Sequence, residues 1–184
     1  MIKHLMAGIA VAALIGSTVS AAKPLAGATP LTADKVKQVF IGYTWSGTAS
    51  GMPTGWQPQE QAVAAQLKGK LVRQFREYYA PNGSIMGWVS GSAFDGYIDG
   101  TWHIKGNELC SSYIIHRKWK LADVRAVGKS RWCYAFVFKN GSVLMTTTRA
   151  PADAGANSVI GRYSRPSLSR GNSVTARYNS IRGR

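Results

Sequence analysis

Apolar and polar residues alternate along much of the chain after residue 70, and this period of two is typical of half-buried β-strands. The clearest run alternates Ile98, Trp102 and Ile104 with Asp99, Thr101 and His103. Helical periodicity is almost absent from the same region. We therefore predict strands over 43–49, 71–79, 84–90, 98–104, 108–115, 132–138 and 143–147.

Short turn motifs between these strands predict three hairpins. Ala80-Pro81-Asn82-Gly83 forms a tight turn, because proline presets one dihedral and glycine accepts a positive φ. Gly106-Asn107 and Asn140-Gly141 are two-residue hairpin signals. The resulting register places Lys105 opposite Glu108, Ile104 opposite Leu109, His103 opposite Cys110, Phe138 opposite Val143 and Phe136 opposite Met145.

An aromatic row follows from the last of these hairpins. With this register, one face carries Trp132, Tyr134, Phe136 and Phe138. Such a row forms either part of a packed core or the wall of a cavity, and we favour the core.

One short helix is predicted before the strands. Thr32 is a suitable N-cap, Asp34 fits the first turn, and Val36, Val39 and Phe40 form an apolar stripe that ends before Gly42. Together the elements predict a mainly β fold. We expect this N-terminal helix to precede an antiparallel β-meander that closes into a small barrel or sandwich, with a lipocalin-like barrel as one form.

The N-terminus has the three parts of a secretory signal: a positive start at Lys3, the apolar run 5–19, and small residues suited to cleavage after Ala21 or Ala22. The alternative is a membrane anchor, but the run is shorter than the roughly 20 residues that span a bilayer. We expect a signal peptide over 1–22, a linker over 23–30, no transmembrane segment after cleavage, and location in the periplasm or outside the cell.

The length of 184 residues allows one globular domain, which we place at 31–149. Its two cysteines, Cys110 and Cys133, are expected to form a disulfide in an oxidising compartment. Two unpaired, buried thiols are the alternative.

Positive charge is concentrated in two places. The formal net charge is +15, and the loss of Lys3 with the signal peptide lowers it by one. The segment 116–120 interleaves cations with Trp119. It either binds anions or forms a hairpin loop with a snorkelling tryptophan, and we favour the loop. The range 150–184 is arginine-rich and poor in large apolar residues, which predicts a flexible, disordered tail. The candidate anion-binding residues are Arg117, Lys118, Lys120, Arg162, Arg165, Arg170, Arg177, Arg182 and Arg184.

No catalytic or metal-binding motif is evident in the sequence. After signal cleavage only His103 and His116 remain, and no His, Cys or carboxylate pair has metal-ligand spacing. There is no G-x-S-x-G motif and no phosphate-binding glycine loop. Glu77, Asp95 and Asp99 are the only carboxylates that suggest an acid–base pair, and solvated acids explain them better. The sequence thus predicts a protein that is not an enzyme and has no cofactor.

Several of these motifs together resemble a known family. Tyr78-Tyr79-Ala80-Pro81-Asn82-Gly83, Gly100-Thr101-Trp102, Leu109-Cys110, Cys133-Tyr134 and Asn140-Gly141 are similar to those of small exported proteobacterial proteins of the domain of unknown function 995 type. The resemblance covers about 31–147 and implies a short helix followed by a β-meander with two cysteines on late strands. The arginine-rich tail and the long basic segment between the cysteines depart from that pattern. The family implies no catalytic residues.

Two functions remain open. The first is a binding or structural module of the cell envelope with affinity for anionic components, such as lipid headgroups or polyanionic sugars. Nucleic acid is a weaker candidate partner. The alternative is a lipocalin-like carrier that holds a small apolar ligand in a barrel cavity.

Overall fold

The computed structural model describes residues 24–50, 72–120, 125–151 and 161–183, with four single positions at 58, 62, 65 and 66. The predicted signal peptide lies outside these ranges. The strands are β1 Thr29–Pro30, β2 Tyr43–Ser50, β3 Val72–Tyr79, β4 Ser84–Gly91, β5 Phe94–Lys105, β6 Glu108–Trp119, β7 Arg125–Lys139, β8 Ser142–Arg149 and β9 Ser167–Arg170. The two labelled helices are α1 Ala33–Phe40 and α3 Thr175–Arg182.

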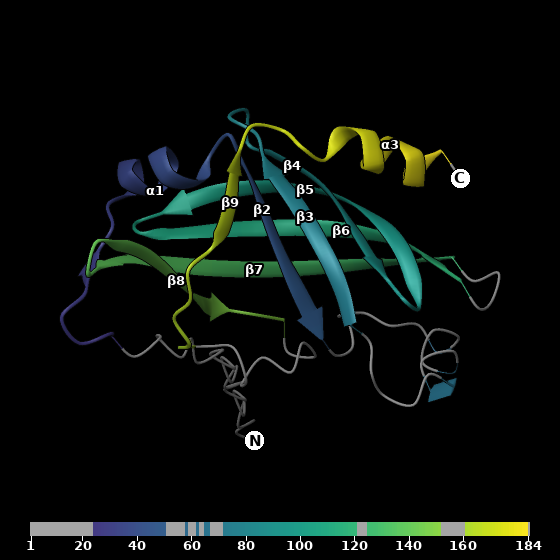
Figure 1. Ribbon diagram of the computed structural model, residues 1–184, viewed down its shortest axis with the longest axis horizontal. Coiled ribbons are helices and arrows are strands. Elements are labelled where there is room, and N and C mark those ends of the chain that lie inside the picture. Colours follow the sequence, from purple (N-terminus) through teal and green to yellow (C-terminus); the bar gives the residue numbers. More distant parts are fainter. Residues whose placement is uncertain are drawn as a thin grey trace, which may run out of the picture.

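The strands form one antiparallel sheet that curls into a half-barrel (Figure 1). Its order is β1-β7-β6-β5-β4-β3-β2-β9, and β8 also pairs with β7. The segment between β8 and β9 approaches both edges of the sheet, because Ser164 bridges to Met145 of β8 while β9 pairs with β2. The prediction of a mainly β, antiparallel meander is confirmed at this level.

The predicted hairpin registers are confirmed. Ile104 pairs with Leu109 and His103 with Cys110 around the first two-residue turn. Phe136 pairs with Met145 and Phe138 with Val143 around the second. At the second turn both residues have positive φ, 49° at Asn140 and 73° at Gly141, as a type I′ turn requires.

Two strands are longer than predicted, and they replace the expected loop at 116–120. β6 continues to Trp119, whose side chain is buried, so this tryptophan does not snorkel at a loop surface. β7 begins at Arg125 instead of Trp132. Inward positions in the added parts hold Arg117 and small residues such as Ala126, which hides the usual apolar alternation.

The core fills the concave side of the half-barrel, and α1 lies against it. Thr32 caps α1 by accepting a hydrogen bond from the Lys35 backbone N–H. The buried ring of Phe40 packs against Tyr79 and Phe136, with ring centroids 4.8 and 5.3 Å away. The helix thereby buries its apolar stripe against strands that come from distant parts of the sequence.

The predicted aromatic row is only partly core. Tyr134 and Phe136 are buried, and Trp132 packs on the core at its margin. Phe138 lies beyond the core and keeps 47 % of its surface exposed. A register shift between Cys133 and Tyr134 in the β7–β8 pairing interrupts the regular ladder near this row.

The disordered basic tail predicted from residue 150 is not confirmed. Residues 161–183 contain β9 and α3, and Val174, Tyr178 and Ile181 are buried. Thr44, itself buried, fixes the turn between the two elements: its hydroxyl donates to the Gly171 carbonyl and accepts from the Ser173 N–H. Figure 1 shows α3 lying over β4 and β5. Within the predicted linker, Thr29–Pro30 forms β1.

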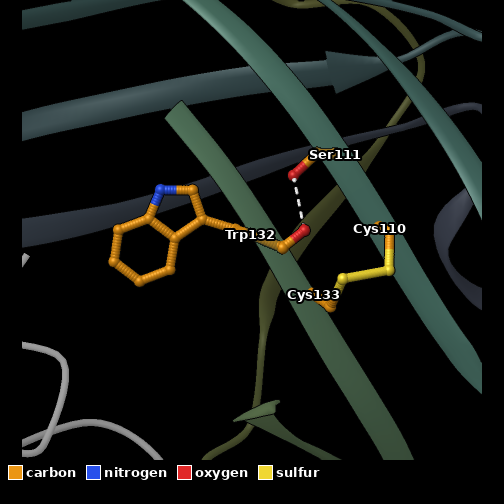
Figure 2. The surroundings of a disulfide bond; sticks show 4 residues. All are labelled: Cys110, Ser111, Trp132 and Cys133. Carbon is orange, nitrogen blue, oxygen red and sulfur yellow. Dashed lines mark hydrogen bonds between the residues drawn. A yellow bond between two sulfur atoms is a disulfide. The ribbon is translucent and has the colours of Figure 1, made fainter. Parts of the chain in front are cut away.

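The Cys110–Cys133 disulfide is present and joins neighbouring strands β6 and β7 (Figure 2). The two cysteines are direct cross-strand partners, with Cα atoms 4.1 Å apart. Beside the disulfide, Ser111 donates its hydroxyl to the Trp132 carbonyl at 3.4 Å.

Of the helices in the described ranges, none is long and apolar enough to cross a bilayer.

Candidate anion-binding face

A basic surface covers the outward side of two neighbouring strands. We define the β6–β7 outer face as the outward positions from Ser112 to Lys118 on β6 and from Arg125 to Arg131 on β7. These positions hold four cations, two apolar side chains, one serine and one histidine, and no acid: Ser112, Ile114, His116, Lys118, Arg125, Val127, Lys129 and Arg131. All four cations are exposed.

The strand register places like charges side by side. Lys118 and Arg125 are direct cross-strand partners. Like charges directly opposite each other destabilise an antiparallel pair, on the order of a few tenths of a kcal/mol. An anion bound between the two cations would remove this repulsion.

Apolar side chains lie between the cations. Ile114 is paired with Lys129, and Val127 with His116. Ile114 is 38 % exposed and Val127 is 52 % exposed. Mixed cationic and apolar surfaces of this kind suit a membrane interface, where cations meet headgroups and apolar side chains meet the acyl boundary.

In the part of the chain that the structure describes, two acids of β5 lie beside this face and also contact groups outside it. Asp95 accepts a hydrogen bond from Ser90 and lies 3.3 Å from Nζ of Lys120 and 3.7 Å from the Arg177 guanidinium. Asp99 accepts a hydrogen bond from the Tyr178 hydroxyl at 2.6 Å. Asp99 also lies 3.8 Å from Nε2 of His116, and Asp95 is the cross-strand partner of Lys118, so both carboxylates border the edge of the face next to β5.

A hollow of about 240 Å³ lies where α3 meets this face. Its walls come from β5, β6, β7 and α3, and include Tyr97, His116, Lys118, Arg125, Val127, Ile181 and Arg182. The rings of Tyr97 and His116 stack with their centroids 4.3 Å apart and an interplanar angle of 8°. The hollow therefore combines an aromatic wall, an apolar lining, cations from three elements and the carboxylate of Asp95.

The structure brings together some of the sequence-predicted anion-binding residues. Lys118 lies on the β6–β7 outer face, and Arg182 borders the hollow. Lys120 and Arg177 both contact Asp95. These residues come from the two basic segments that the sequence treats as separate.

Other predicted residues lie elsewhere. Arg117 borders the hollow but is only 2 % exposed, so it adds little to the surface. Arg162, Arg165 and Arg170 are exposed on the segment that leads to and forms β9, which pairs with β2. Arg184 lies outside the described ranges.

Three cations of the face were missed in the sequence: Arg125, Lys129 and Arg131. The signal was available in the sequence, since every cation from Arg125 to Arg131 lies at an odd-numbered position and the even-numbered positions between them hold alanine, glycine and serine. Small inward residues made this stretch look like a loop, although the same pattern is typical of a strand with one charged face.

A second polar cluster lies inside the half-barrel. Glu77 is buried, and the hydroxyls of Tyr79 and Tyr113 each donate to its Oε2 atom at 2.9 Å. Burial raises the pKa of Glu77 to about 7, against the lowering effect of the two hydrogen bonds. The pKa values of both tyrosines are raised well above 10, mainly by burial and then by the charge of Glu77. The cluster lies within the packed core, whereas the basic face is open to solvent.

In the ranges that the structure describes, no group of three His, Cys, Asp or Glu residues is placed to hold a metal ion.

No family model, curated protein or solved structure matches the chain. The site is therefore interpreted from its own geometry and charge.

Proposed function

We propose that this protein is a non-catalytic binding module of the cell envelope, exported to the periplasm or beyond, that attaches to anionic components through the β6–β7 outer face. The observation that carries the proposal is the set of four exposed cations on that face, with no acid among its outward positions. The signal-like N-terminus and the net charge of +15 support it. So does the motif resemblance to exported proteins of the domain of unknown function 995 type.

The expected mode of attachment is reversible and sensitive to salt. Each basic residue near an anionic membrane surface contributes about 1 kcal/mol, and screening acts over about 8–10 Å at moderate ionic strength. Because the cations project from a disulfide-linked pair of strands, they meet a flat surface without rearrangement of the core. The exposed side chains of Ile114 and Val127 add a small apolar contribution.

Vesicle co-sedimentation tests this proposal. The mature protein should bind phosphatidylcholine vesicles only when phosphatidylglycerol is included, and added salt should weaken the binding. Lys129→Gln combined with Arg131→Gln should weaken it by up to about 30-fold, since two contributions of about 1 kcal/mol are lost.

The matched control removes one lysine and one arginine elsewhere: Lys35→Gln on α1 and Arg76→Gln on β3. Both residues are exposed and lie outside the β6–β7 outer face. If this control loses as much affinity as the first pair, attraction depends on total charge, and the proposed face has no special role. Absence of binding to either kind of vesicle would refute the proposal.

The lipocalin-like carrier is the competing proposal. The curl of the sheet and the position of α1 against its concave side support it. Against it, large side chains such as Tyr79, Phe94 and Phe136 occupy the described interior. Native mass spectrometry distinguishes the two, because a carrier would retain a co-purified apolar ligand of defined mass.

A further inference from the structure

We infer that the hollow between α3 and the β6–β7 outer face is a binding site for a single phosphate monoester group. The inference rests on the proposed function and deepens it: the outer face supplies diffuse attraction, and the hollow selects the kind of anion. Its basis is the convergence of three cations from three different elements on one small, partly apolar space.

The three cations are Lys118 of β6, Arg125 of β7 and Arg182 of α3, and all of them line the hollow. Lys118 and Arg125 are fixed opposite each other by the strand register. This arrangement places two like charges at one spot of a rigid sheet, where a shared anion would offset their repulsion.

Arg182 is held beside these two residues by a defined chain of contacts. Its guanidinium donates to the Tyr178 hydroxyl at 3.3 Å and lies 5.9 Å from the centre of the Tyr178 ring. Tyr178 is in turn fixed to Asp99 of β5 at 2.6 Å. A guanidinium fork held in this way suits bidentate recognition of phosphate oxygens.

Among the described residues that line the hollow, Asp95 is the one acid, and it lies opposite Lys118 in the β5–β6 pairing. Asp95 accepts from Ser90 and contacts Lys120 and Arg177. The carboxylate is thus shared among Lys118, Lys120 and Arg177, whereas the described lining holds four cations: Arg117, Lys118, Arg125 and Arg182. Positive potential at the hollow remains for an incoming anion.

The size of the hollow favours a headgroup over a whole lipid. About 240 Å³ is below the roughly 300–1,000 Å³ of pockets that enclose drug-sized ligands. Val127 and Ile181 offer apolar contact for the carbon atoms attached to the phosphate. A monoester carries about −1.5 to −2 charges at neutral pH and presents three acceptor oxygens, which matches three converging cations better than a diester does.

The test compares vesicles that contain phosphatidic acid, a monoester, with vesicles that contain phosphatidylglycerol, a diester, at equal surface potential. We expect at least about tenfold tighter binding to phosphatidic acid, since charge-assisted hydrogen bonds contribute about 1.5–3 kcal/mol each. Arg182→Ala and Lys118→Ala should each remove most of this preference. Arg182→Lys should retain part of it, and Arg76→Ala should leave it unchanged.

Free glycerol 3-phosphate separates a lipid-bound from a soluble source of the monoester. If millimolar glycerol 3-phosphate competes with the vesicles, the hollow binds the soluble monoester. If phosphatidic acid is preferred and glycerol 3-phosphate does not compete, the hollow binds the monoester only at a membrane surface. Equal binding of both vesicle types, with Arg182→Ala no different from Arg76→Ala, would overturn the inference and leave the proposed function intact. Failure to bind either vesicle type would overturn both. Circular dichroism of each variant checks that the fold is retained.

Discussion

Tyr113 donates its hydroxyl to Oε2 of Glu77 at 2.9 Å, although the two residues lie 36 positions apart on β6 and β3. Tyr79 donates to the same oxygen, and the two tyrosine oxygens are 2.6 Å apart. Three polar groups thus meet at one buried point of the half-barrel. The pKa of Glu77, raised to about 7 by burial, makes this cluster sensitive to pH near neutrality.

The first prediction concerns the pH dependence of stability. In the folded protein Glu77 binds its proton more tightly than in the unfolded chain, where its pKa is near 4.5. This contribution to stability is complete below pH 4.5 and is lost as the pH rises through about 7. The difference corresponds to roughly 3 kcal/mol. Glu77→Gln should therefore raise stability at pH 8 relative to the wild type and change it little at pH 5.

Urea unfolding at pH 5 and pH 8 measures this effect for both proteins. Every other titratable group is common to both proteins, so the comparison isolates Glu77. If the urea midpoint changes by the same amount between pH 5 and pH 8 in the wild type and in Glu77→Gln, Glu77 does not titrate in this range.

The second prediction concerns Gly100, which lies opposite Tyr113 in the β5–β6 pairing. A Cβ atom at this position would lie 2.5 Å from the Ser112 carbonyl oxygen and 3.2 Å from the Tyr113 ring. Gly100→Ala should destabilise the protein by about 1–3 kcal/mol, because the strands must separate or the tyrosine must shift. Thr101→Ala, at the exposed neighbouring position, is the control and should change the unfolding midpoint much less. Equal effects would mean that the close approach is easily relieved.

The hairpins could be predicted from sequence because their determinants are local. Gly106-Asn107 and Asn140-Gly141 set turn geometry within two residues, and the register of the flanking strands follows from it. The disulfide was predictable as a pair, and its direct cross-strand position followed only from the β6–β7 register.

The C-terminal elements could not be predicted in the same way, because their stabilising contacts are long-range. The Tyr178 hydroxyl donates a hydrogen bond to Asp99, 79 positions away, and the Ser173 N–H donates one to the Thr44 hydroxyl, 129 positions away. A signal was nevertheless present: Val174, Tyr178 and Ile181 have helical spacing and form the buried side of α3. The low overall hydrophobicity of this stretch obscured them. The cations of β7 were missed for a related reason. They occupy the outward-facing positions of a strand whose inward-facing side chains are small, so the usual apolar alternation is absent.

The third prediction concerns the Cys110–Cys133 disulfide. It links residues separated by 23 positions, and chain-entropy estimates give roughly 3 kcal/mol for a loop of this size. Reduction with dithiothreitol, or the double variant Cys110→Ala and Cys133→Ala, should lower the free energy of unfolding by about that amount. Thiol labelling of denatured, unreduced protein provides the check, and two reactive thiols per chain would contradict the bond.

The last prediction concerns Tyr178, which fastens α3 to the sheet. Its hydroxyl donates to Asp99, and its ring packs edge-on against Tyr97 at 5.6 Å. Tyr178→Phe removes the hydroxyl's hydrogen bonds to Asp99 and from Arg182 but keeps the ring. It should cost about 1 kcal/mol, because Asp99 is partly exposed and regains water. Tyr178→Ala also removes the buried ring, so α3 should detach while the hairpins from β3 to β8 stay folded.

Limited trypsin digestion distinguishes these states through the arginines of the same segment. In the wild type, cleavage after Arg170 and Arg177 should be slow, because β9 and α3 hold that backbone in regular structure. Tyr178→Ala should accelerate cleavage at both sites far more than Tyr178→Phe does. Rapid removal of the segment from the wild-type protein would mean that α3 is not stably docked, and the hollow beside it would then lose Arg182.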